Sequence, residues 1–375
     1  MLPQNGSNCR KQAKFVAKDL HGSSGVGPGY DVGFRYSREH ATDWRNKLVY
    51  VTDGTLVNWI VTDQIGKFSV VMIDEAHERS INIDLILGLL KAQLPRYPHL
   101  RLIIASATID AEKFVSYYGN VPLECIKKEV EAGRSLSEVA NDLGVGYIEF
   151  REGEPGWLKE AKERGCAPPI DKYGGQLYEV RFRQGKPIPM HLWPAQMPAL
   201  VADKVFEILE AIERGEEVEG DILAFLHGER PIEEACKRVR ERVEEDERLV
   251  GKVDVFPLYT RLPQDQQRDA YGPKKDPNRW RVVISTNVAE TSLTVEGIVH
   301  VVDSGLINES NWDPATQTMI VSPTVHSAAG IRQRWGRSGR IRHGVVHCLY
   351  TEEQFAEIAK IKPHTSHLTL LTKSG

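Results

Sequence analysis

Short apolar runs alternate with stretches of helical periodicity along most of this chain, and this rhythm restricts the fold more than any other feature. The runs at 47–51, 70–73 and 102–105 each end in small or polar residues, and an amphipathic stretch at 83–94 lies between the last two. Such alternation is the pattern of βαβ units, in which helices join parallel strands. The sequence therefore predicts an α/β protein whose mostly parallel sheets are flanked by helices.

The rhythm is interrupted once, between residues 123 and 175, where the chain becomes charged and glycine-rich. It then resumes with apolar runs that predict further strands, at 177–182, 222–226, 253–258, 281–284 and 298–302. With 375 residues the chain is long enough for two domains. We expect one α/β domain at 1–122, a connector or insertion at 123–175, and a second α/β domain at 176–375. Residues 137–143 faintly resemble half of a helix-turn-helix unit, but an inserted connector explains the segment better.

Composition excludes several classes of protein. No apolar run reaches the ~18 residues of a membrane-spanning helix, and the first residues lack the apolar core of a signal peptide. Five cysteines lie far apart, with no Cys-x-x-Cys pair and no histidine at zinc-binding spacing. A net charge of −4 does not fit a generally basic nucleic-acid-coating protein, so phosphate contacts require a local basic group. We expect an intracellular protein, cytoplasmic or nuclear, that binds no membrane.

Two carboxylates stand at the end of the predicted strand 70–73. Asp74 and Glu75, followed by Ala76 and His77, come directly after this strand and open a helical stretch. Open α/β sheets bind ligands beyond the carboxyl ends of their strands. An acidic pair there can hold the water shell of a nucleotide-bound Mg²⁺ and orient an attacking water. The alternative is that both carboxylates only cap the following helix, and the tetrapeptide alone does not decide.

Arginines recur at a fixed interval near the end of the second domain. Arg334, Arg337 and Arg340 stand at i, i+3 and i+6, which predicts that they share one side of a helix. Arginine makes bidentate contacts to phosphate, and a γ-phosphate in transfer requires its developing charge to be neutralised. A generic basic helix face is the alternative, although the interleaved glycines lower helix stability and fit it poorly. Carboxylates and arginines on different domains form one site only if the domains meet, so we expect nucleotide-dependent closure.

Four segments together resemble motifs II, III, V and VI of the DEAH-box helicases of superfamily 2. These segments are Asp74 to His77, Ser106 to Thr108, Ser285 to Ser292 and Gln333 to Arg340. They occur in the order of that family, and the resemblance covers about residues 8–122 and 176–362. It implies two RecA-like P-loop NTPase domains and an ATP-dependent RNA helicase, with ATP or another nucleoside triphosphate and Mg²⁺ as cofactors. The implied partners are single-stranded or partly duplex RNA and a protein activator. The alternatives are a catalytically impaired nucleic-acid-binding module and a DNA-directed translocase.

The resemblance also implies catalytic and coupling roles. The implied catalytic residues are Asp74, Glu75, His77, Gln333, Arg337 and Arg340. Among them the two carboxylates direct Mg²⁺, largely through water, and the glutamate polarises the attacking water. The histidine senses the opposite domain near the glutamine, which helps to orient the water, and the last two arginines are the arginine fingers. Ser106 and Thr108 would couple hydrolysis to domain movement; for both, a turn after a strand is the alternative.

Binding roles are implied in the same way. The nucleotide contacts are Tyr271, Glu290, Thr291 and Asp303. The nucleic-acid contacts are Thr52, Asp53, Gly54, His227, Gly228, Thr286 and Asn287. A position in the core is the alternative for Tyr271, and capping of a strand end is the alternative for Thr286 and Thr291. Residues 308–321 resemble the hairpin that wedges at the strand in this family, and a plain surface hairpin is the alternative.

One motif that the resemblance requires is missing from this sequence. A Gly-x-x-x-x-Gly-Lys-Ser/Thr loop should precede motif II, and the glycine-rich stretch 22–29 contains no lysine. Without such amides and lysine the phosphates lose most of their cradle. We therefore expect this chain alone to bind ATP weakly and to hydrolyse it poorly, which RNA-stimulated ATPase activity of the purified chain would contradict. Truncation is the simplest account, because the carboxy-terminal winged-helix and ratchet region is missing too. Trp335 is a smaller departure, because the family usually has a small residue there.

Overall fold

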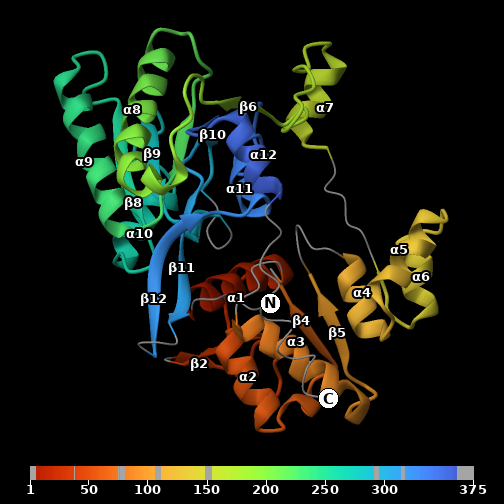
Figure 1. The fold of residues 1–375 in the computed structure, drawn as a ribbon. Helices are drawn as coiled ribbons and strands as arrows, with labels where there is room; N and C mark the ends of the chain where they lie inside the picture. The colour runs from red at the N-terminus through yellow and green to blue at the C-terminus, as the bar shows by residue number, and fades with distance from the viewer. Residues whose placement is uncertain are drawn as a thin grey trace. The chain divides into compact units, whose positions relative to one another are not determined.

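The structure is a computed structural model, and it describes residues 6–37, 39–74, 76, 81–105, 111–147, 154–290, 295–313 and 317–360. The chain divides into two compact units, which are coloured from red to yellow and from yellow-green to blue in Figure 1. Unit 1 holds the described residues up to 147, and unit 2 holds those from 154 to 360. Each unit is described by itself below.

Unit 1 contains the three strands and the helix that the sequence predicted at 47–51, 70–73, 102–105 and 83–94, together with elements that were not predicted. Its elements are α1 (Gly6–His21), β1 (Val32–Tyr36), β2 (Glu39–Ala41), β3 (Leu48–Val51), α2 (Asp53–Val61), β4 (Val70–Ile73), α3 (Ile81–Gln93), β5 (Arg101–Ile104), α4 (Ala111–Gly119), α5 (Leu123–Glu131) and α6 (Leu136–Asp142). β1 pairs with β3 in parallel and with β2 antiparallel, whereas β4 pairs in parallel with β5. In the part that the structure describes, these strands form two small sheets rather than one.

An apolar core joins α2 and α3 to β3 and β4. In α3 the side chains of Ile83, Ile86, Leu87 and Leu90 recur at i, i+3, i+4 and i+7, and all four are buried. This spacing places them on one face, as an amphipathic helix on a sheet requires. α3 ends at Gln93, two residues before Pro95. Proline has no backbone N–H to donate to a helical hydrogen bond, so it favours this end.

Unit 2 is built on one six-stranded parallel sheet. Its elements are α7 (Gly156–Glu163), β6 (Tyr178–Phe182), α8 (Trp193–Glu213), β7 (Asp221–Phe225), α9 (Glu229–Glu245), β8 (Val253–Leu258), α10 (Gln264–Tyr271), β9 (Trp280–Ser285), β10 (Ile298–Asp303), β11 (Leu306–Asp313), β12 (Thr318–Val325), α11 (Ala328–Trp335), β13 (Gly344–Cys348) and α12 (Glu352–Lys360). The strand order is β6-β13-β10-β7-β9-β8, with every pair parallel. Unit 2 is therefore α/β, with a parallel sheet flanked by helices, as predicted.

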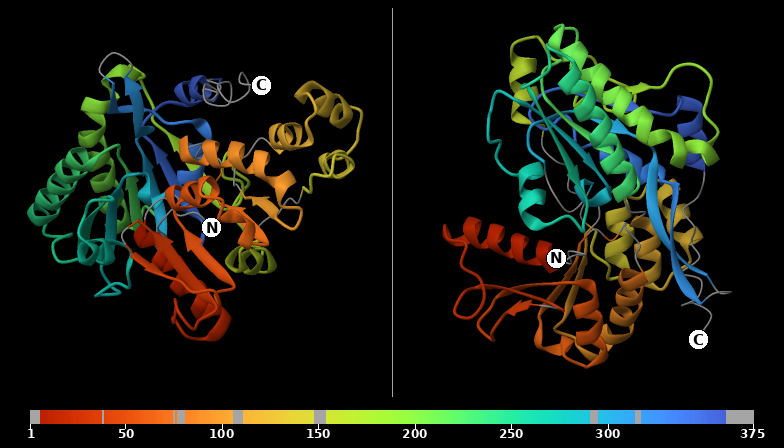
Figure 2. Two further views of the ribbon diagram at one scale, coloured as in Figure 1. Left: turned by 90° about the horizontal axis from the view of Figure 1, so that it is seen from below. Right: turned by 90° about the vertical axis from the view of Figure 1, so that its left-hand side faces the viewer.

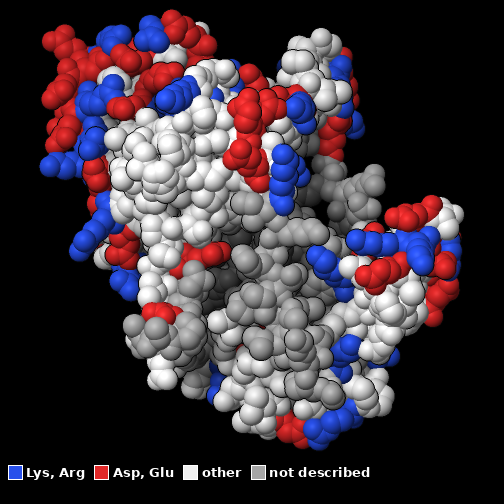
Figure 3. All heavy atoms as spheres, in the orientation of Figure 1, with Lys and Arg blue, Asp and Glu red and all other residues white. Residues whose placement is uncertain are grey.

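Apolar residues of the inner strands are buried on both faces of this sheet, and every residue of β7 and β10 is buried. α8 and α9 pack against each other and the sheet, and α11 packs on β10 and α12 (Figure 1). The outer face of α9 carries ion pairs such as Glu234 with Arg238, and Figure 3 shows acidic and basic side chains interspersed over this surface. The charged residues of α9 thus form a solvated face.

Two further predictions meet the structure in different ways. The hairpin predicted at 308–321 is present as β11 and β12, which pair antiparallel and extend away from the sheet of unit 2 (Figure 2). The predicted connector 123–175 does not form one body. Its first part, α5 and α6, packs against α4 of unit 1, and a capping box between Ser135 and Glu138 begins α6. The residues from 154 onward belong to unit 2. Among the described helices, none has the length and apolar character needed to cross a membrane.

A pair of histidines is buried inside the sheet of unit 2. His300 of β10 and His347 of β13 have Nδ1 and Nε2 3.4 Å apart, and His300 Nε2 lies 2.7 Å from the carbonyl oxygen of Val218. Burial lowers the pKa of both imidazoles, and the neighbouring His300 lowers the pKa of His347 further. The folded protein therefore binds protons at this pair less readily than the unfolded chain does.

We expect the protein to lose stability as the pH falls below the ordinary histidine pKa of about 6.5. Below this pH the unfolded chain takes up protons that the folded pair does not, so stability is complete above it and declines below it. The free energy of unfolding in urea should fall by up to ~1.4 kcal/mol per pH unit for each such proton. H347Q should flatten this dependence, and the same change at the exposed His191 should not. Equal pH slopes for H347Q and the wild type would refute the assignment.

Candidate functional site

In unit 1, Asp74 directly follows β4 at the carboxyl edge of the β4–β5 sheet. The amide of Ala105 donates to the carbonyl oxygen of Ile73 (2.8 Å), and the amide of Ala76 donates to that of Ala105 (3.1 Å). The ends of the two strands are thereby held together beyond the sheet. Asp74 is partly buried; burial and the nearby Asp74 carboxylate raise the pKa of the Tyr50 phenol. The structure thus places this acidic residue where α/β sheets bind ligands.

The other predicted residues of this edge cannot be placed. Glu75, His77, Ser106 and Thr108 lie outside the described residues, and their roles stay predictions. Among the residues that the structure does describe, no three histidine, cysteine or acidic side chains gather into a metal-binding group. That Asp74 and Glu75 direct Mg²⁺, largely through water, therefore stays a prediction.

The segment Thr52 to Gly54 forms the junction between β3 and α2. The Asp53 Oδ2 accepts a hydrogen bond from the Asn82 side chain at the start of α3 (2.9 Å), and its Oδ1 accepts one from the Gly54 amide (2.7 Å). The hydroxyl of Thr52 lies 3.0 Å from that of Thr55. Asp53 therefore ties the beginnings of α2 and α3 together, while Gly54 remains exposed.

In unit 2, the strand ends of β7 and β9 lie side by side and carry the predicted nucleic-acid contacts. The amide of Leu226 donates to the carbonyl oxygen of Ser285 (2.9 Å), so His227 and Gly228 follow β7 beside Thr286 and Asn287, which follow β9. The Thr286 hydroxyl caps the short 3-10 turn Asn287–Ala289 by accepting from the Val288 amide, and the side chain of Asn287 is exposed. The structure therefore gathers four of these residues at one edge of one sheet.

His227 and Gly228, the residues after β7 at this edge, each have a distinctive environment. Burial lowers the pKa of His227, and its Nδ1 is buried without a hydrogen-bond partner. A Cβ at Gly228 would lie 3.1 Å from the Asn308 side-chain nitrogen of β11, so glycine permits the close approach of the hairpin to this edge. His227 is therefore a neutral imidazole near neutral pH, able to donate or accept one hydrogen bond at each nitrogen.

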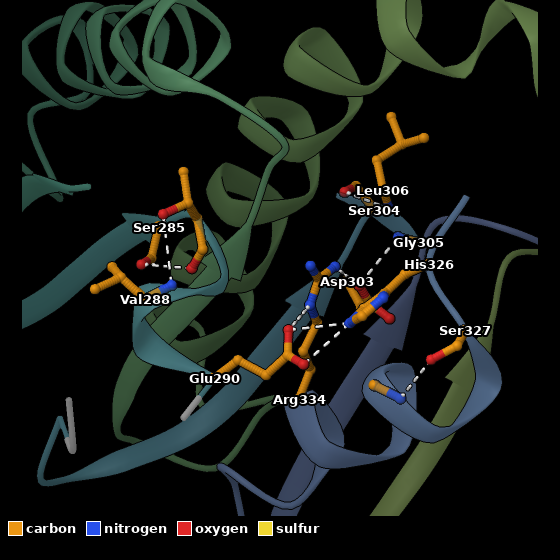
Figure 4. Close-up of polar contacts among 12 residues, drawn as sticks. Ser285, Val288, Glu290, Asp303, Ser304, Gly305, Leu306, His326, Ser327 and Arg334 are labelled. Carbon is orange, nitrogen blue, oxygen red and sulfur yellow. Dashed lines mark hydrogen bonds and ion pairs between the residues drawn. The ribbon is translucent and has the colours of Figure 1, made fainter. Parts of the chain in front are cut away.

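A buried ion cluster lies beside the same edge, between the ends of β9 and β10 and the helix α11 (Figure 4). Arg334 is fully buried; its Nε donates to Glu290 and its Nη1 to Asp303, each over 3.0 Å. His326 Nε2 lies 3.0 and 3.1 Å from the two carboxylate oxygens of Glu290. Asp303 also accepts from the Tyr350 hydroxyl (2.7 Å) and the Gly305 amide (3.0 Å).

The electrostatics of the cluster hold it in the charged form. Burial alone would raise the pKa of Glu290, but the Arg334 guanidinium and His326 together lower it below its usual range. Burial likewise acts to lower the pKa of Arg334, and its two carboxylate partners raise it. Every carboxylate oxygen of Glu290 and Asp303 already contacts a protein group. Their nucleotide-binding roles therefore stay predictions, and in this structure they hold α11 to the sheet.

The prediction that three arginines share one helical face is wrong. α11 ends at Trp335, and the amides of Gly336 and Arg337 turn back to the carbonyl oxygens of Arg332 and Arg334. Arg334 is buried in the cluster, Arg337 is partly buried in the following turn, and Arg340 is exposed. Gly339 has a φ of +78°, which lies in the left-handed region, so a right-handed α-helix cannot continue through it. The arginines are therefore divided between a structural cluster and a loop.

The remaining predicted residues lie at several places. Gln333 is partly buried in the last turn of α11, and Tyr271 ends α10 and packs against the apolar core of unit 2. The position of Tyr271 fits the alternative of a core residue, and its nucleotide contact stays a prediction. Thr291 lies outside the described residues. Sequence reasoning missed His326, which no motif marks and whose partner Glu290 is 36 residues away.

Comparisons with known proteins agree with this architecture. Residues 203–342 match the family described as helicase conserved C-terminal domain. The chain is similar to the solved structure of the DEAH/RHA helicase HrpB of Escherichia coli, with 26% identity and a TM-score of 0.67 over 95% of this chain and 37% of that one. A second structure, of the E. coli DExH-box NTPase HrpB, matches with 26% identity and a TM-score of 0.65 over 95% of this chain and 36% of that one. The chain thus spans little more than a third of these relatives.

Proposed function

Because this chain belongs to the DExH-box helicases of superfamily 2, we propose that it is the core of an ATP-dependent RNA helicase, which couples NTP hydrolysis to movement along a strand. The observation that carries the proposal is the carboxyl edge of the unit 2 sheet. There the residues after β7 and β9, of which Asn287 is exposed and the others are half-buried, lie beside the buried cluster that leads into the loop of Arg337 and Arg340. The proposal names RNA because of the family.

The hydrolytic part of the proposal assigns each polar group one task. When bound, Mg²⁺ would neutralise charge on the phosphates and direct a water molecule. Asp74, at the tip of β4, would hold its water shell, and Glu75 would accept a proton from the attacking water. Arg337 and Arg340 would neutralise the charge that develops on the transferred phosphate, and Gln333 would orient the water. Arg334 does not reach the phosphate in this proposal, since its guanidinium is committed to Glu290 and Asp303.

The nucleic-acid part rests on sequence-independent contacts to the strand backbone. Hydroxyl, amide and backbone N–H groups bind phosphate and sugar oxygens without reading bases. The exposed Asn287 and the partly exposed Thr286 supply such groups. Gly228 has no side chain, so its backbone N–H could approach a phosphate closely. A nucleic-acid-binding module that does not hydrolyse ATP is the second candidate.

We expect the N287A variant to bind single-stranded RNA about fivefold to tenfold more weakly than the wild type, the effect of one or two lost hydrogen bonds. Fluorescence anisotropy of a labelled RNA of about 12 nucleotides, measured over a range of salt concentrations, gives the dissociation constant. Asn278, an exposed asparagine in another turn of unit 2, provides the control N278A. The same measurement with single-stranded DNA separates an RNA helicase from a DNA-directed translocase. Unchanged RNA affinity in N287A would remove this edge from the nucleic-acid site.

A further inference from the structure

The loop that carries Arg337 and Arg340 is contacted by a segment that precedes the sheet of unit 2. We call residues 336–343 the arginine loop and residues 154–177 the bracing segment. Trp157 of α7 donates from its indole Nε1 to the carbonyl oxygen of Gly339, over 3.0 Å. At the other end of the segment, the carbonyl oxygen of Leu177 accepts from the amide of Gly344 (3.0 Å). The arginine loop is therefore bonded to this segment near its middle and directly after its last residue.

The close contact between loop and segment depends on glycine. A Cβ at Gly339 would lie 2.4 Å from the carbonyl oxygen of Leu177, and the φ of +78° at this residue is itself unfavourable for other residues. A Cβ at Gly344 would lie 2.6 Å from the Gly339 nitrogen. The loop backbone thus approaches the Leu177 carbonyl at Gly339, and its own end at Gly344, more closely than a side chain at either glycine allows.

A second contact joins the bracing segment to the helix that leads into the loop. The ring of Tyr173 meets those of Trp335, Phe355 and Phe182 edge-on, with ring centroids 5.9, 5.8 and 5.2 Å apart. Trp335 is fully buried and ends α11, so the large side chain that departs from the family's small residue is covered by Tyr173. Edge-to-face pairs of this kind are attractive beyond the burial of their surface.

The bracing segment is itself fixed in place. A tight turn holds Tyr173: Asp171 Oδ1 accepts from the amides of Tyr173 (2.7 Å) and Gly174 (2.8 Å). The hydroxyl of Tyr173 and the ammonium of Lys172 both donate to Glu352 Oε1 of α12, over 2.5 and 2.6 Å. Leu158 of α7 is buried. The segment is therefore a packed part of unit 2 and can restrict the loop that it contacts.

We propose that Trp157 and Tyr173 are positioning residues that hold the arginine loop in one conformation. This inference rests on the proposed function, because the loop matters for hydrolysis only if its arginines reach the phosphate. A turn that contains two glycines, Gly336 and Gly339, has little structure of its own. Arginine fingers must be placed closely, since a displacement of about 1 Å can lower a rate by 10²-fold. The indole hydrogen bond fixes the loop near Gly339, and the aromatic contacts fix its beginning at Trp335.

Hydrogen–deuterium exchange of the amides of residues 336–344 tests this proposal without any nucleotide. Trp157→Phe keeps an aromatic ring and removes the donor, and exchange in the arginine loop should become about fivefold faster, the effect of one hydrogen bond. Tyr173→Leu should act in the same direction through α11. Trp44→Phe, the same change at a tryptophan that is 87% exposed, should leave exchange unchanged. Amides of β7 and β9 report whether the sheet stays folded in each variant.

The possible outcomes distinguish the positioning role of Trp157 and Tyr173 from the proposed function. If the amides of 336–344 exchange at the wild-type rate in both W157F and Y173L, the proposal that these residues hold the arginine loop is overturned, whatever the enzymatic activity. Faster exchange supports it, and a lower kcat with unchanged KM in the same variants would show that loop order serves the chemical step. If the arginine loop loses protection in these variants but the protein does not hydrolyse ATP, the proposed function is wrong, whereas the positioning role of Trp157 and Tyr173 is supported.

Discussion

Arg334→Met is expected to destabilise unit 2 by about 3–5 kcal/mol, the usual effect of removing one partner from a buried ion pair. Arg334 is fully buried and pairs with two carboxylates, which are 4% (Glu290) and 0% (Asp303) exposed. Methionine fills a similar volume but leaves two buried negative charges with fewer donors. Urea unfolding followed by circular dichroism measures the difference, and the midpoint should move to a lower urea concentration with an unchanged slope.

The control for this prediction is the same substitution two residues earlier. Arg332 lies on α11 too, but its side chain is exposed, so Arg332→Met should change stability by no more than about 0.5 kcal/mol. In a second test, Glu290→Gln combined with Arg334→Met should recover part of the loss, because it removes one of the uncompensated charges. If R334M and R332M unfold at the same urea concentration, the buried cluster does not stabilise unit 2.

Arg340→Ala is expected to lower the rate of ATP hydrolysis by ~10³ to 10⁵, the loss observed when an arginine finger is removed. Because we expect the chain alone to hydrolyse ATP poorly, the assay requires a fusion that supplies the missing part. In this fusion a strand, a Gly-x-x-x-x-Gly-Lys-Thr loop and a helix from a family member precede Met1. Single-turnover hydrolysis of ATP with and without single-stranded RNA then gives the rates of both forms.

The matched control for Arg340 is Arg342, which is exposed and lies just beyond the motif VI resemblance. Arg342→Ala removes the same charge from the same loop and should change the rate less than tenfold. ATP affinity should fall little in Arg340→Ala, since the finger acts mainly on charge that develops in the transition state. Equal losses in R340A and R342A would indicate a general electrostatic effect of the loop instead of a finger.

Much of the fold could be predicted from the sequence, because the inner strands of unit 2, such as β7 and β10, are buried on both faces. The runs at 222–226, 253–258 and 298–302 contain few polar residues and fall on β7, β8 and β10 within one residue at each end. A strand with no solvent-facing side reads as a continuous apolar run, which periodicity detects directly. The residues after these runs could also be assigned to one edge, since parallel strands all end on the same side.

The conformation of the arginine loop could not be predicted in the same way. Regular spacing of Arg334, Arg337 and Arg340 favoured a helix, but tertiary contacts decide the outcome. Arg334 finds buried carboxylates 31 and 44 residues away in the sequence, and no local pattern encodes that pairing. Gly339 adopts a left-handed φ beside the carbonyl oxygen of Leu177. A helix through this point would require that contact to be given up.

The contacts of the predicted connector could not be read from the sequence for a similar reason. Its charged and glycine-rich composition indicated an insertion without revealing its contacts. Tyr173 and Trp157 are isolated aromatic residues in a polar stretch, and only the fold shows that they meet Trp335 and Gly339. The unusual tryptophan at position 335 was the one available signal, because a large side chain in a position usually held by a small one requires a cavity formed elsewhere.

RNA-stimulated ATP hydrolysis by the fusion tests the central claim most directly, namely that this chain carries catalytic residues of an RNA-dependent NTPase. We expect the fusion to hydrolyse ATP faster when single-stranded RNA is added, and Arg340→Ala to abolish this stimulation. A folded fusion that binds both ATP and RNA, yet hydrolyses ATP no faster than its Arg340→Ala variant, would contradict the claim and leave a nucleic-acid-binding module.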